Sequence, residues 1–411
     1  MTVSGIGLGY ARDVGDLLTF EQAQARVLEQ IRVLDSERVA LGAAVGRVTA
    51  APAASVVDLP PFASSAMDGY AVRAVDVPGT LPIGGRIAAG RPSVRPLAAG
   101  ETMEISTGGV VPDGADAVVP VESVVQHDNE TVEFPEAVVS GANVRPRGGD
   151  ATAGSAVVDA GVVLGAAQIG ALAAAGVAEL ECARRPRVAV LATGTELARP
   201  GEQLAPGQVY EANAVMLAAA LAAAGAEVEQ LPAVADAEAA HRAAIERGLA
   251  ADVLVTSGGV SVGPHDLVRA IEAELGVEEI FWRVAMRPGK PVSFGVRGAT
   301  LVFGLPGNPV SSLVGCVLFV VPAVRALQGV RDPLPPFADG VLASALRRNP
   351  ARDDFVRARV RRDGNDTTVE PIVGQESHMI ARAAAANALV HIARGDGEVA
   401  AGERVAWLAL N

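Results

Sequence analysis

Residues 252–266, DVLVTSGGVSVGPHD, form the stretch of sequence that decides the fold of this chain. The apolar and β-branched run from 252 to 256 predicts a buried strand, and the two adjacent glycines that follow predict a turn. The residues from His265 to Leu275 predict a helix. A buried strand that runs through a glycine-rich loop into a helix is typical of a parallel α/β sheet.

The same alternation of strand and helix extends over residues 186–330. Asn213 is the predicted N-cap of one helix, and Gly225 follows its end. Because strands and helices alternate, we expect a doubly wound α/β domain with a mostly parallel sheet. The other predicted strands lie at 187–192, 227–231, 280–285 and 300–303, and the other predicted helices at 213–221, 236–249 and 309–327.

The flanking segments predict three further domains. Residues 15–50 and residues 151–185 each contain a helical pattern, and the segment between them, residues 51–150, is a turn-rich β pattern. If the two helical pieces pack together, the β domain is an insertion in a helical one. After a proline-rich linker, residues 335–411 predict a small β domain. The first helix is predicted from the capping-box pair Thr19 and Gln22 to about Leu34.

Composition and charge exclude several classes of protein. The chain of 411 residues is 50% hydrophobic, which suffices for substantial cores, and its net charge of −13 argues against a general binder of nucleic acids or acidic membranes. Cys182 and Cys316 suggest neither a disulfide framework nor a cysteine metal site. Because the sequence shows no signal-peptide pattern and no long uninterrupted apolar run, we expect a cytoplasmic location and no membrane span.

Four loops follow predicted strands of the α/β segment and carry its chemistry. They are TGTEL at 193–197, SGGVSVGPHD at 257–266, RPGK at 287–290 and GLPGNPVS at 304–311. In an open parallel sheet, ligands bind beyond the carboxyl ends of the strands, so these loops should meet at one edge. Their glycines let backbone N–H groups approach a phosphate, and Glu196 and Asp266 add carboxylates. With cations at Arg287 and Lys290, the set predicts a pocket for a phosphorylated ligand that could hold a divalent metal.

Lys290 stands out because it is the one lysine among 34 lysine and arginine residues. In a chain so biased towards arginine, a retained lysine indicates a position that needs a compact, flexible ammonium, for instance as a point charge on a phosphate. The alternative is the chance survival of one surface lysine. Its position among glycine-bearing loops favours ligand binding.

Ordinary structural roles explain each motif taken alone. A Gly-Gly turn is often only a tight connection, Asp266 could complement a helix dipole, and Glu196 could be solvated. No nucleophile elbow, Walker loop or paired-cysteine site occurs in the sequence, which does not favour covalent catalysis. A second polar cluster lies in the β segment and comprises SSAMDGYA at 64–71, STGG at 106–109 and NVRPRGGD at 143–150. The alternative interpretation is that these residues only form turns and surface ion pairs.

Seven motifs, taken in order, resemble the MoeA family of molybdopterin molybdenumtransferases, which is similar to the C-terminal domain of gephyrin. They are SAMDGYAV at 65–72, GADAVV at 114–119, NVRPRG at 143–148, TGTEL at 193–197, SGGVSVG at 257–263, PGKP at 288–291 and GLPGNPVS at 304–311. The resemblance implies a doubly wound, MogA-like α/β domain, an extended helical domain in two segments, an inserted β domain and a C-terminal β barrel-like domain. It also implies an elongated homodimer with each active site in a cleft between the α/β domain of one copy and the β domain of the other.

The family activity implied by this resemblance uses magnesium, takes adenylylated molybdopterin and molybdate as substrates, and releases molybdenum cofactor and AMP. Glu196 and Asp266 match acids that handle metal or substrate. Lys290 and Asp68 match further catalytic positions. Molybdopterin adenylyltransferase and molybdoenzymes are the candidate protein partners. The positions that match substrate-binding residues are Thr107, Asp150, Thr193, Gly194, Ser257, Gly258, Gly259, Ser261, Arg287, Gly289, Pro306, Gly307, Asn308 and Ser311.

The chain departs from the family pattern at several acids. Thr195 stands where an aspartate usually follows Thr-Gly, Ala63 replaces an aspartate, and Pro264 replaces a glutamate. Arg287 replaces a lysine. These substitutions keep open a second hypothesis, a non-catalytic paralogue that binds molybdopterin or a partner as a carrier or scaffold. A third is that the α/β domain adenylylates molybdopterin itself, since the adenylyltransferase family shares this domain type.

Overall fold

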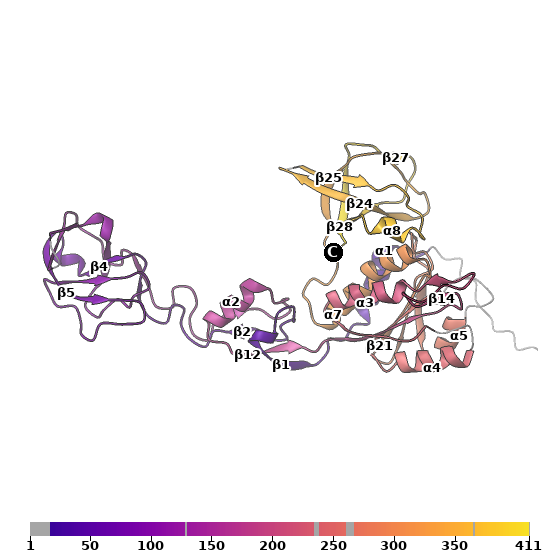
Figure 1. The fold of residues 1–411 in the computed structure, drawn as a ribbon, viewed down its shortest axis with the longest axis horizontal. Helices are drawn as coiled ribbons and strands as arrows, with labels where there is room; N and C mark the ends of the chain where they lie inside the picture. Colours follow the sequence, from indigo (N-terminus) through magenta and orange to yellow (C-terminus); the bar gives the residue numbers. More distant parts are fainter. Residues whose placement is uncertain (1–16, 128–129, 234–237, 260–266, 365, 411) are drawn as a thin grey trace, which may run out of the picture. The chain divides into compact units, whose positions relative to one another are not determined.

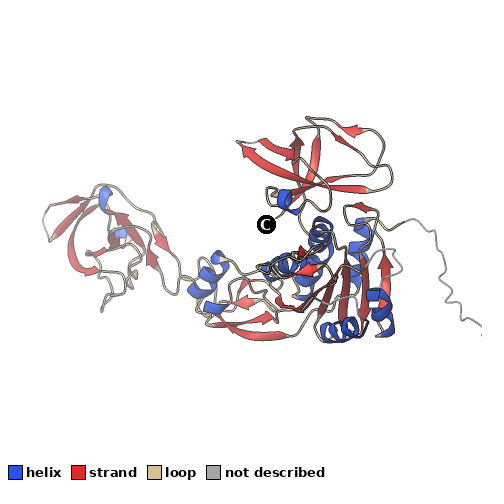
Figure 2. Ribbon diagram, turned by 45° about the vertical axis from the view of Figure 1, so that its right-hand side comes forward, coloured by secondary structure: helices blue, strands red, loops and turns tan. Residues whose placement is uncertain are grey.

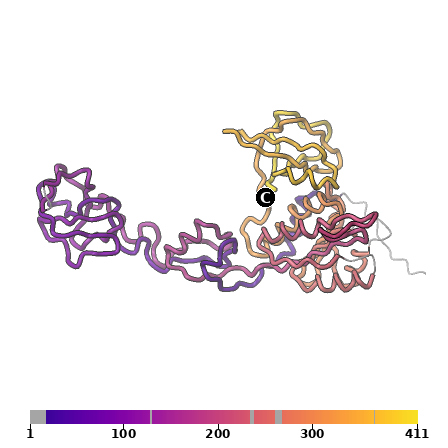
Figure 3. The backbone as a smooth tube through the Cα atoms, viewed as in Figure 1, coloured from indigo at the N-terminus to yellow at the C-terminus, as the bar shows by residue number. Residues whose placement is uncertain are grey.

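The computed structural model describes residues 17–127, 130–233, 238–259, 267–364 and 366–410. It separates into two compact units: the α/β unit, made of residues 1–35 and 183–411, and the inserted unit, made of residues 36–182. Figure 1 follows the chain from indigo to yellow, and Figure 3 shows the same path as a tube. Each unit has hydrophobic cores of its own.

A six-stranded sheet forms the centre of the α/β unit. Its order is β16 (Glu227–Gln230), β13 (Arg187–Ala192), β17 (Val253–Ser257), β21 (Thr300–Leu305), β20 (Ser293–Arg297) and β18 (Glu278–Trp282). The first four strands run parallel, and β20 and β18 run antiparallel to their neighbours. The prediction of a mostly parallel sheet is confirmed, although the sequence patterns do not predict β20.

Helices cover both faces of this sheet, as Figure 2 shows. Because successive strand side chains alternate, Val188 and Val190 of β13 belong to one core and Leu191 to the other. The doubly wound α/β fold is therefore confirmed. The first core includes α1 (Phe20–Glu29), α3 (Asn213–Ala223), α6 (Pro309–Gly315), the π-helical segment η4 (Cys316–Val320) and α7 (Val321–Leu327). The second core includes α4 (Glu238–Gly248) and α5 (Leu267–Glu274).

The segments α6, η4 and α7 form one apolar helix, Pro309–Leu327. Within the described part of the chain, it is the one helix long and apolar enough to cross a membrane by length and composition. However, 72% of its most apolar window is buried, and Val314 and Phe319 belong to the first core. The buried Gln24 side chain of α1 donates a hydrogen bond to the Leu318 carbonyl at 2.8 Å. Core packing accounts for the apolar composition of this helix.

The C-terminal region of the α/β unit is a closed barrel, as the resemblance implies. Its strands pair in the order β24 (Asp353–Asp363), β25 (Asp366–Pro371), β22 (Ala338–Leu342), β28 (Arg404–Ala409) and β26 (Ala388–Ile392), and β26 pairs back with β24. A short strand, β19 (Met286–Arg287), pairs in parallel with β24 and places Arg287 opposite Asp354. The remaining short elements are β14 (Leu197–Ala198), β15 (Val209–Tyr210), β23 (Leu346–Arg347), β27 (Glu398–Val399) and α8 (Ile380–Ala383).

The inserted unit contains a second six-stranded sheet, with the order β7 (Ala117–Pro120), β4 (Gly69–Val72), β6 (Thr102–Ile105), β5 (Gly79–Ile87), β9 (Thr131–Phe134) and β8 (Val125–Gln126). Helix α2 (Ala166–Ala174) buries Leu172 in a separate core with Val39 and Val158. Three two-stranded pairs complete the strands: β1 (Ser36–Ala40) with β12 (Glu179–Ala183), and two antiparallel pairs, β2 (Ala53–Ala54) with β11 (Ala156–Val158) and β3 (Ser64–Ser65) with β10 (Val144–Arg145). Single helical turns are η1 (Leu41–Ala43), η2 (Ala74–Asp76) and η3 (Val121–Ser123).

The first helix differs from its prediction in length. The Thr19 capping box is present, but α1 ends at Glu29 with Gln30 as its C-cap. Ile31 and Leu34 continue the apolar pattern outside the helix, where they pack against the same core. Helix α1 packs on η4 and α7 in the α/β unit, whereas α2 packs in the inserted unit. The boundaries of the four predicted domains remain a prediction.

Candidate functional site

The parallel strands of the α/β unit have a topological switch point between β13 and β17. From β13 the chain goes to β16 on one side, and then crosses to β17 on the other. Ligands of open α/β sheets bind in the crevice that such a divergence creates at the carboxyl ends of the strands. The loop after β13 begins at Thr193, and the loop after β17 begins at Gly258. Both loops therefore border the position where a ligand is expected.

Backbone contacts hold three of the predicted loops together. The Thr193 N–H donates to the Ser257 carbonyl at 3.0 Å, and the Gly258 N–H donates to the Leu305 carbonyl at 3.0 Å. Gly258 has a φ of +95°, and a Cβ atom there would lie 2.7 Å from the Thr193 carbonyl oxygen. A Cβ atom on Gly307 would lie 3.6 Å from the Gly258 Cα. Glycine at 258 is thus required for the close approach of the loops.

Asn213 links these loops through its side chain. Its Nδ2 donates to the Ser257 Oγ at 2.9 Å and to the Gly307 carbonyl at 2.8 Å. Ser257 is buried, and its hydroxyl lies 3.3 Å from both the Ser312 Oγ and the Pro306 carbonyl. One amide group therefore fixes the end of β17 relative to the loop after β21.

The sequence patterns miss this role of Asn213 because they assign it as a helix cap. Helix α3 begins at Asn213 itself, and Ala212 occupies the N-cap position without a side-chain capping bond. The Glu211 carboxylate instead accepts a hydrogen bond from the Ala214 N–H at 2.7 Å. The signal in the sequence is an amide residue at the start of the helix between β13 and β16, near the ligand-binding edge.

The predicted acids of this edge are only partly described. Glu196 is exposed, and its carboxylate turns back over Gly194, where an added Cβ atom would lie within 2.7 Å of both oxygens. Asp266 and Ser261, together with the substituted position Pro264, lie outside the described residues. Within the described ranges no group of three or more His, Cys, Asp or Glu residues could hold a metal ion. The pairing of Glu196 with Asp266 remains a prediction.

Lys290 lies on a loop that contacts the start of the long apolar helix. A Cβ atom on the buried Gly289 would lie 3.5 Å from the Ser311 carbonyl oxygen, so the two predicted loops are close. The Lys290 carbonyl accepts a hydrogen bond from the Val284 N–H at 3.0 Å. Its side chain is half-buried, and its ammonium makes no hydrogen bond or ion pair with the described residues. A cation held in this way is available to an anionic ligand.

Arg287 and Asn308 differ in their surroundings. Arg287 forms an ion pair with the Asp354 carboxylate of β24, so this predicted ligand-binding cation has a partner inside the protein. Burial raises the pKa of the Asp354 carboxyl, and the nearby Arg287 guanidinium opposes that shift. Asn308 is the N-cap of α6, but its side chain makes no capping bond and is exposed.

In the inserted unit, the second predicted cluster brings Asp68 and Thr107 together. The Asp68 Oδ1 accepts a hydrogen bond from the Thr107 N–H at 2.7 Å, and both residues are exposed. Asp150 is exposed, and its N–H donates to the Leu59 carbonyl at 2.8 Å. These contacts fix the Asp68 side chain and the backbones of Thr107 and Asp150, and they leave carboxylate oxygens at the surface of the unit.

A cavity of about 460 Å³ lies at the carboxyl ends of β13 and β16. Ala192 and Leu197, which flank the loop after β13, are part of its lining. Charged groups come from Arg199, Glu202 and the buried Glu211. The carboxyl edge of the sheet, where a ligand is predicted, thus has a polar hollow beside the loop that carries Glu196.

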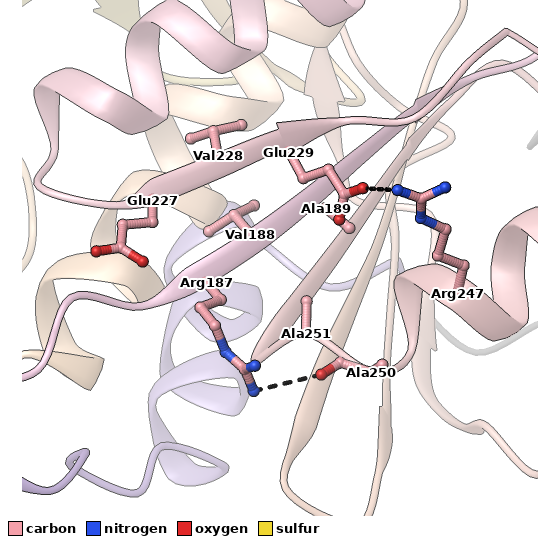
Figure 4. Close-up of a pocket in the computed structure, with 9 residues that line it drawn as sticks. All are labelled: Arg187, Val188, Ala189, Glu227, Val228, Glu229, Arg247, Ala250 and Ala251. Carbon is pink, nitrogen blue, oxygen red and sulfur yellow. Dashed lines mark hydrogen bonds and ion pairs between the residues drawn. The ribbon is translucent and has the colours of Figure 1, made fainter.

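A second cavity, of about 400 Å³, lies at the amino ends of the same strands and is drawn in Figure 4. Three of its four charged side chains already have partners within the protein, and Arg247 pairs with Glu229. Arg187 donates to the Ala250 carbonyl at 3.4 Å. Its position at the wrong end of the parallel strands excludes it as the site predicted by the loops.

Comparison with known proteins connects this arrangement to one family. Three family models match in chain order: the MoeA N-terminal region (domain I and II) at residues 18–176, a probable molybdopterin binding domain at residues 189–326, and the MoeA C-terminal region (domain IV) at residues 339–410. "Molybdopterin molybdenumtransferase 2" of Mycobacterium tuberculosis is 38% identical over 400 residues, which cover 94% of this chain and 98% of the relative. The chain belongs to the MoeA family.

Other MoeA-family proteins are similar over the same length. The molybdopterin molybdenumtransferase of Haemophilus influenzae is 35% identical over 95% of this chain and 98% of its own length. A crystal structure of the molybdopterin biosynthesis MoeA protein from Pyrococcus horikoshii matches with a TM-score of 0.81 and 30% identity, over 96% of this chain and 99% of that chain. In this MoeA chain, the loops joined by Asn213 and the Lys290 loop all lie within the match to the probable molybdopterin binding domain.

Proposed function

We propose that this MoeA-family chain is a molybdopterin molybdenumtransferase that inserts molybdate into adenylylated molybdopterin and releases molybdenum cofactor and AMP. The observation that carries the proposal is the set of loops joined by Asn213, beside a lysine that has no partner among the described residues, in the segment matched by the molybdopterin binding domain. Curated relatives named molybdopterin molybdenumtransferase cover nearly the whole chain and support the same activity.

The reaction breaks a phosphoanhydride, so negative charge develops on phosphate oxygens. In this proposal the N–H group of Gly259 and the ammonium of Lys290 bind those oxygens. Molybdate is also an oxyanion and needs donors of the same kind. The other residues proposed to bind substrate at this edge are Thr193, Gly194, Ser257, Ser261, Arg287, Gly289, Pro306, Gly307, Asn308 and Ser311.

The exposed Glu196 carboxylate at this edge is of the kind that magnesium binds. Magnesium is commonly held by one or two carboxylates together with substrate phosphates, rather than by a cage of protein ligands. Glu196 offers an exposed carboxylate next to the switch point, and we propose that Asp266 supplies the second. Bound magnesium would neutralise charge on the phosphates. The protein's own part is to hold the Glu196 carboxylate on the loop that follows β13.

We expect that replacing Asn213 by aspartate lowers kcat/KM for adenylylated molybdopterin by about 100-fold, and that alanine lowers it by about 10-fold. The Asn213 amide donates two hydrogen bonds, and alanine only removes them. Aspartate would place a carboxylate oxygen about 2.8 Å from the Gly307 carbonyl and add negative charge near the bound phosphate. Rates of AMP release, with thermal unfolding as a check on folding, test this order; equal losses in both variants would contradict it.

We further propose a homodimer in which Asp68, Thr107 and Asp150 act on substrate held by the other copy. This part rests on the resemblance to MoeA proteins. Mixing Asp68→Ala subunits with Lys290→Met subunits, each nearly inactive alone, is then expected to restore about a quarter of wild-type activity, because half of the dimers are mixed and one of their two sites is intact. No recovery after subunit exchange has been verified by mass spectrometry would count against a shared site.

The two alternative functions give different products. A non-catalytic carrier would bind adenylylated molybdopterin tightly without releasing AMP. An adenylyltransferase would release pyrophosphate when given ATP and molybdopterin. We expect AMP release from the adenylylated substrate and no pyrophosphate from ATP, and the reverse result would overturn the proposal.

A cytoplasmic location, and contacts with molybdopterin adenylyltransferase and molybdoenzymes, are proposed on the basis of the resemblance to MoeA proteins. They can be tested by cell fractionation and pull-down.

A further inference from the structure

Asp354 of the C-terminal barrel is a buried carboxylate whose partner is at the ligand-binding edge. Its side chain is 2% exposed, whereas that of Arg287 is 56% exposed. The Oδ2 of Asp354 accepts a hydrogen bond from the Nη2 of Arg287, and its Oδ1 is buried without a hydrogen-bond partner among the described residues. The pair joins strand β24 of the barrel to strand β19, which leads into the Lys290 loop.

This arrangement is unfavourable as a purely structural contact. A buried carboxylate is destabilising unless it is paired and hydrogen-bonded, and here one oxygen has no partner. The guanidinium of Arg287 is the counter-charge within hydrogen-bond distance of Asp354. Arginine has five N–H donors, and those other than the one used by Asp354 make no hydrogen bond with the described residues. The pair therefore leaves a cation of fixed orientation with unused donors.

The neighbouring carboxylate, Asp353, shows what a structural contact looks like at this position. It is also buried, and its Oδ1 accepts a hydrogen bond from the Arg394 N–H at 2.9 Å. The His391 Nε2 lies 3.4 Å from the same oxygen. Both of these partners belong to the barrel region. Asp353 thus provides a matched control, because it shares the strand and the burial of Asp354 but does not pair with Arg287.

We propose that Asp354 is a positioning residue for the transfer reaction, which holds the Arg287 guanidinium so that its unused donors meet an anionic oxygen of the substrate. This inference rests on the proposed function and adds a contribution of the barrel to it. The oxygen belongs either to the phosphate of adenylylated molybdopterin or to molybdate, since both are oxyanions that a guanidinium binds through parallel N–H groups.

A double-mutant cycle between Asp354→Asn and Arg287→Ala tests the inference. We expect Asp354→Asn to lower kcat for AMP release by about 10- to 100-fold while KM changes less than about 2-fold, because orientation rather than charge is lost. In the Arg287→Ala background, the same change should have no further effect on kcat. Asp353→Asn should lower thermal stability, and any effect of it on kcat should be the same in both backgrounds.

Equal losses from Asp354→Asn in both backgrounds, or no loss in either, would overturn the inference. If Asp354→Asn alone does not fold, the double variant Asp354→Asn/Arg287→Ala is used, because it removes both charges of the pair. Its kcat must then equal that of Arg287→Ala. Titrations of the wild-type and Asp354→Asn proteins with AMP and with inorganic molybdate identify the oxygen. A weaker affinity for AMP in the variant indicates the phosphate, and a weaker affinity for molybdate indicates molybdate. Unchanged affinities for both ligands would contradict the role. If the wild-type protein releases no AMP, the proposed function fails, whereas these affinities still test the coupling of Asp354 and Arg287.

Discussion

Alanine at position 69 is expected to unfold the central sheet of the inserted unit. Gly69 begins β4, between β6 and β7, and a Cβ atom there would lie 2.0 Å from the Val119 carbonyl oxygen and 2.9 Å from the Pro120 Cα. Both are backbone atoms of β7, which pairs with β4 through this stretch. They can give way only if the strands separate, so we expect a loss of about 4 kcal/mol or more. The contact between Asp68 and Thr107 should be lost with it.

Hydrogen exchange and chemical unfolding of the Gly69→Ala variant measure this effect. The sheet strands of residues 69–72, 102–105 and 117–120 should lose protection, while the α/β unit keeps it. Gly170→Ala in α2 is the matched control, because a Cβ atom there meets nothing within 4 Å. In a helix this change should be neutral or stabilising by up to about 1 kcal/mol. Native protection of these strands against hydrogen exchange in the Gly69→Ala variant would contradict the expected clash between the added Cβ atom and the β7 backbone.

Replacing Lys290 by methionine is expected to lower kcat/KM by about 100- to 1,000-fold with little change in stability. The half-buried ammonium has no partner among the described residues, so its loss leaves no internal charge unpaired. Arginine at 290 keeps the charge but is a larger, planar group, and we expect it to recover no more than about a tenth of the activity. Full activity of Lys290→Arg would contradict the need for a compact ammonium.

The lysine also permits a direct binding measurement. Because Lys290 is the one lysine of the chain, reductive methylation with a ¹³C label marks a single side chain besides the α-amine. We expect its NMR signal to shift on addition of adenylylated molybdopterin. An unchanged signal at saturating substrate would show that Lys290 lies outside the site, whatever its effect on activity.

The sequence predicts the parallel part of the α/β sheet well because its strands are continuous apolar runs with glycine-rich loops after them. It misses β20 because that strand, SFGVR, contains a glycine and follows the PGKP loop without a clear boundary. It extends α1 to Leu34 because Ile31 and Leu34 keep the helical spacing even though they pack as a loop. Apolar periodicity reports burial, and the secondary structure of a short segment is decided by its tertiary contacts.

The candidate site is predictable to the level of loops and less so to the level of side chains. The glycine at 258 and the position of Lys290 on a loop of this edge follow from sequence patterns, whereas the lack of a partner for its ammonium among the described residues is seen only in the structure. The pairing of Arg287 with Asp354 does not, because 67 positions separate the two residues and only the closure of the barrel brings them together. The role of Asn213 is hidden for a similar reason, since its two partners lie in loops far along the chain.

The most direct test of the account is a single-turnover reaction of the purified protein with adenylylated molybdopterin, in which released AMP and pterin-bound molybdenum are counted together, with and without molybdate. The account predicts molybdate-dependent release of one AMP for each molybdenum bound to the pterin, and the loss of both in Lys290→Met. Tight binding of the substrate with no AMP release would contradict it and would indicate a carrier, and Thr195→Asp would then be the first variant to test for restored activity.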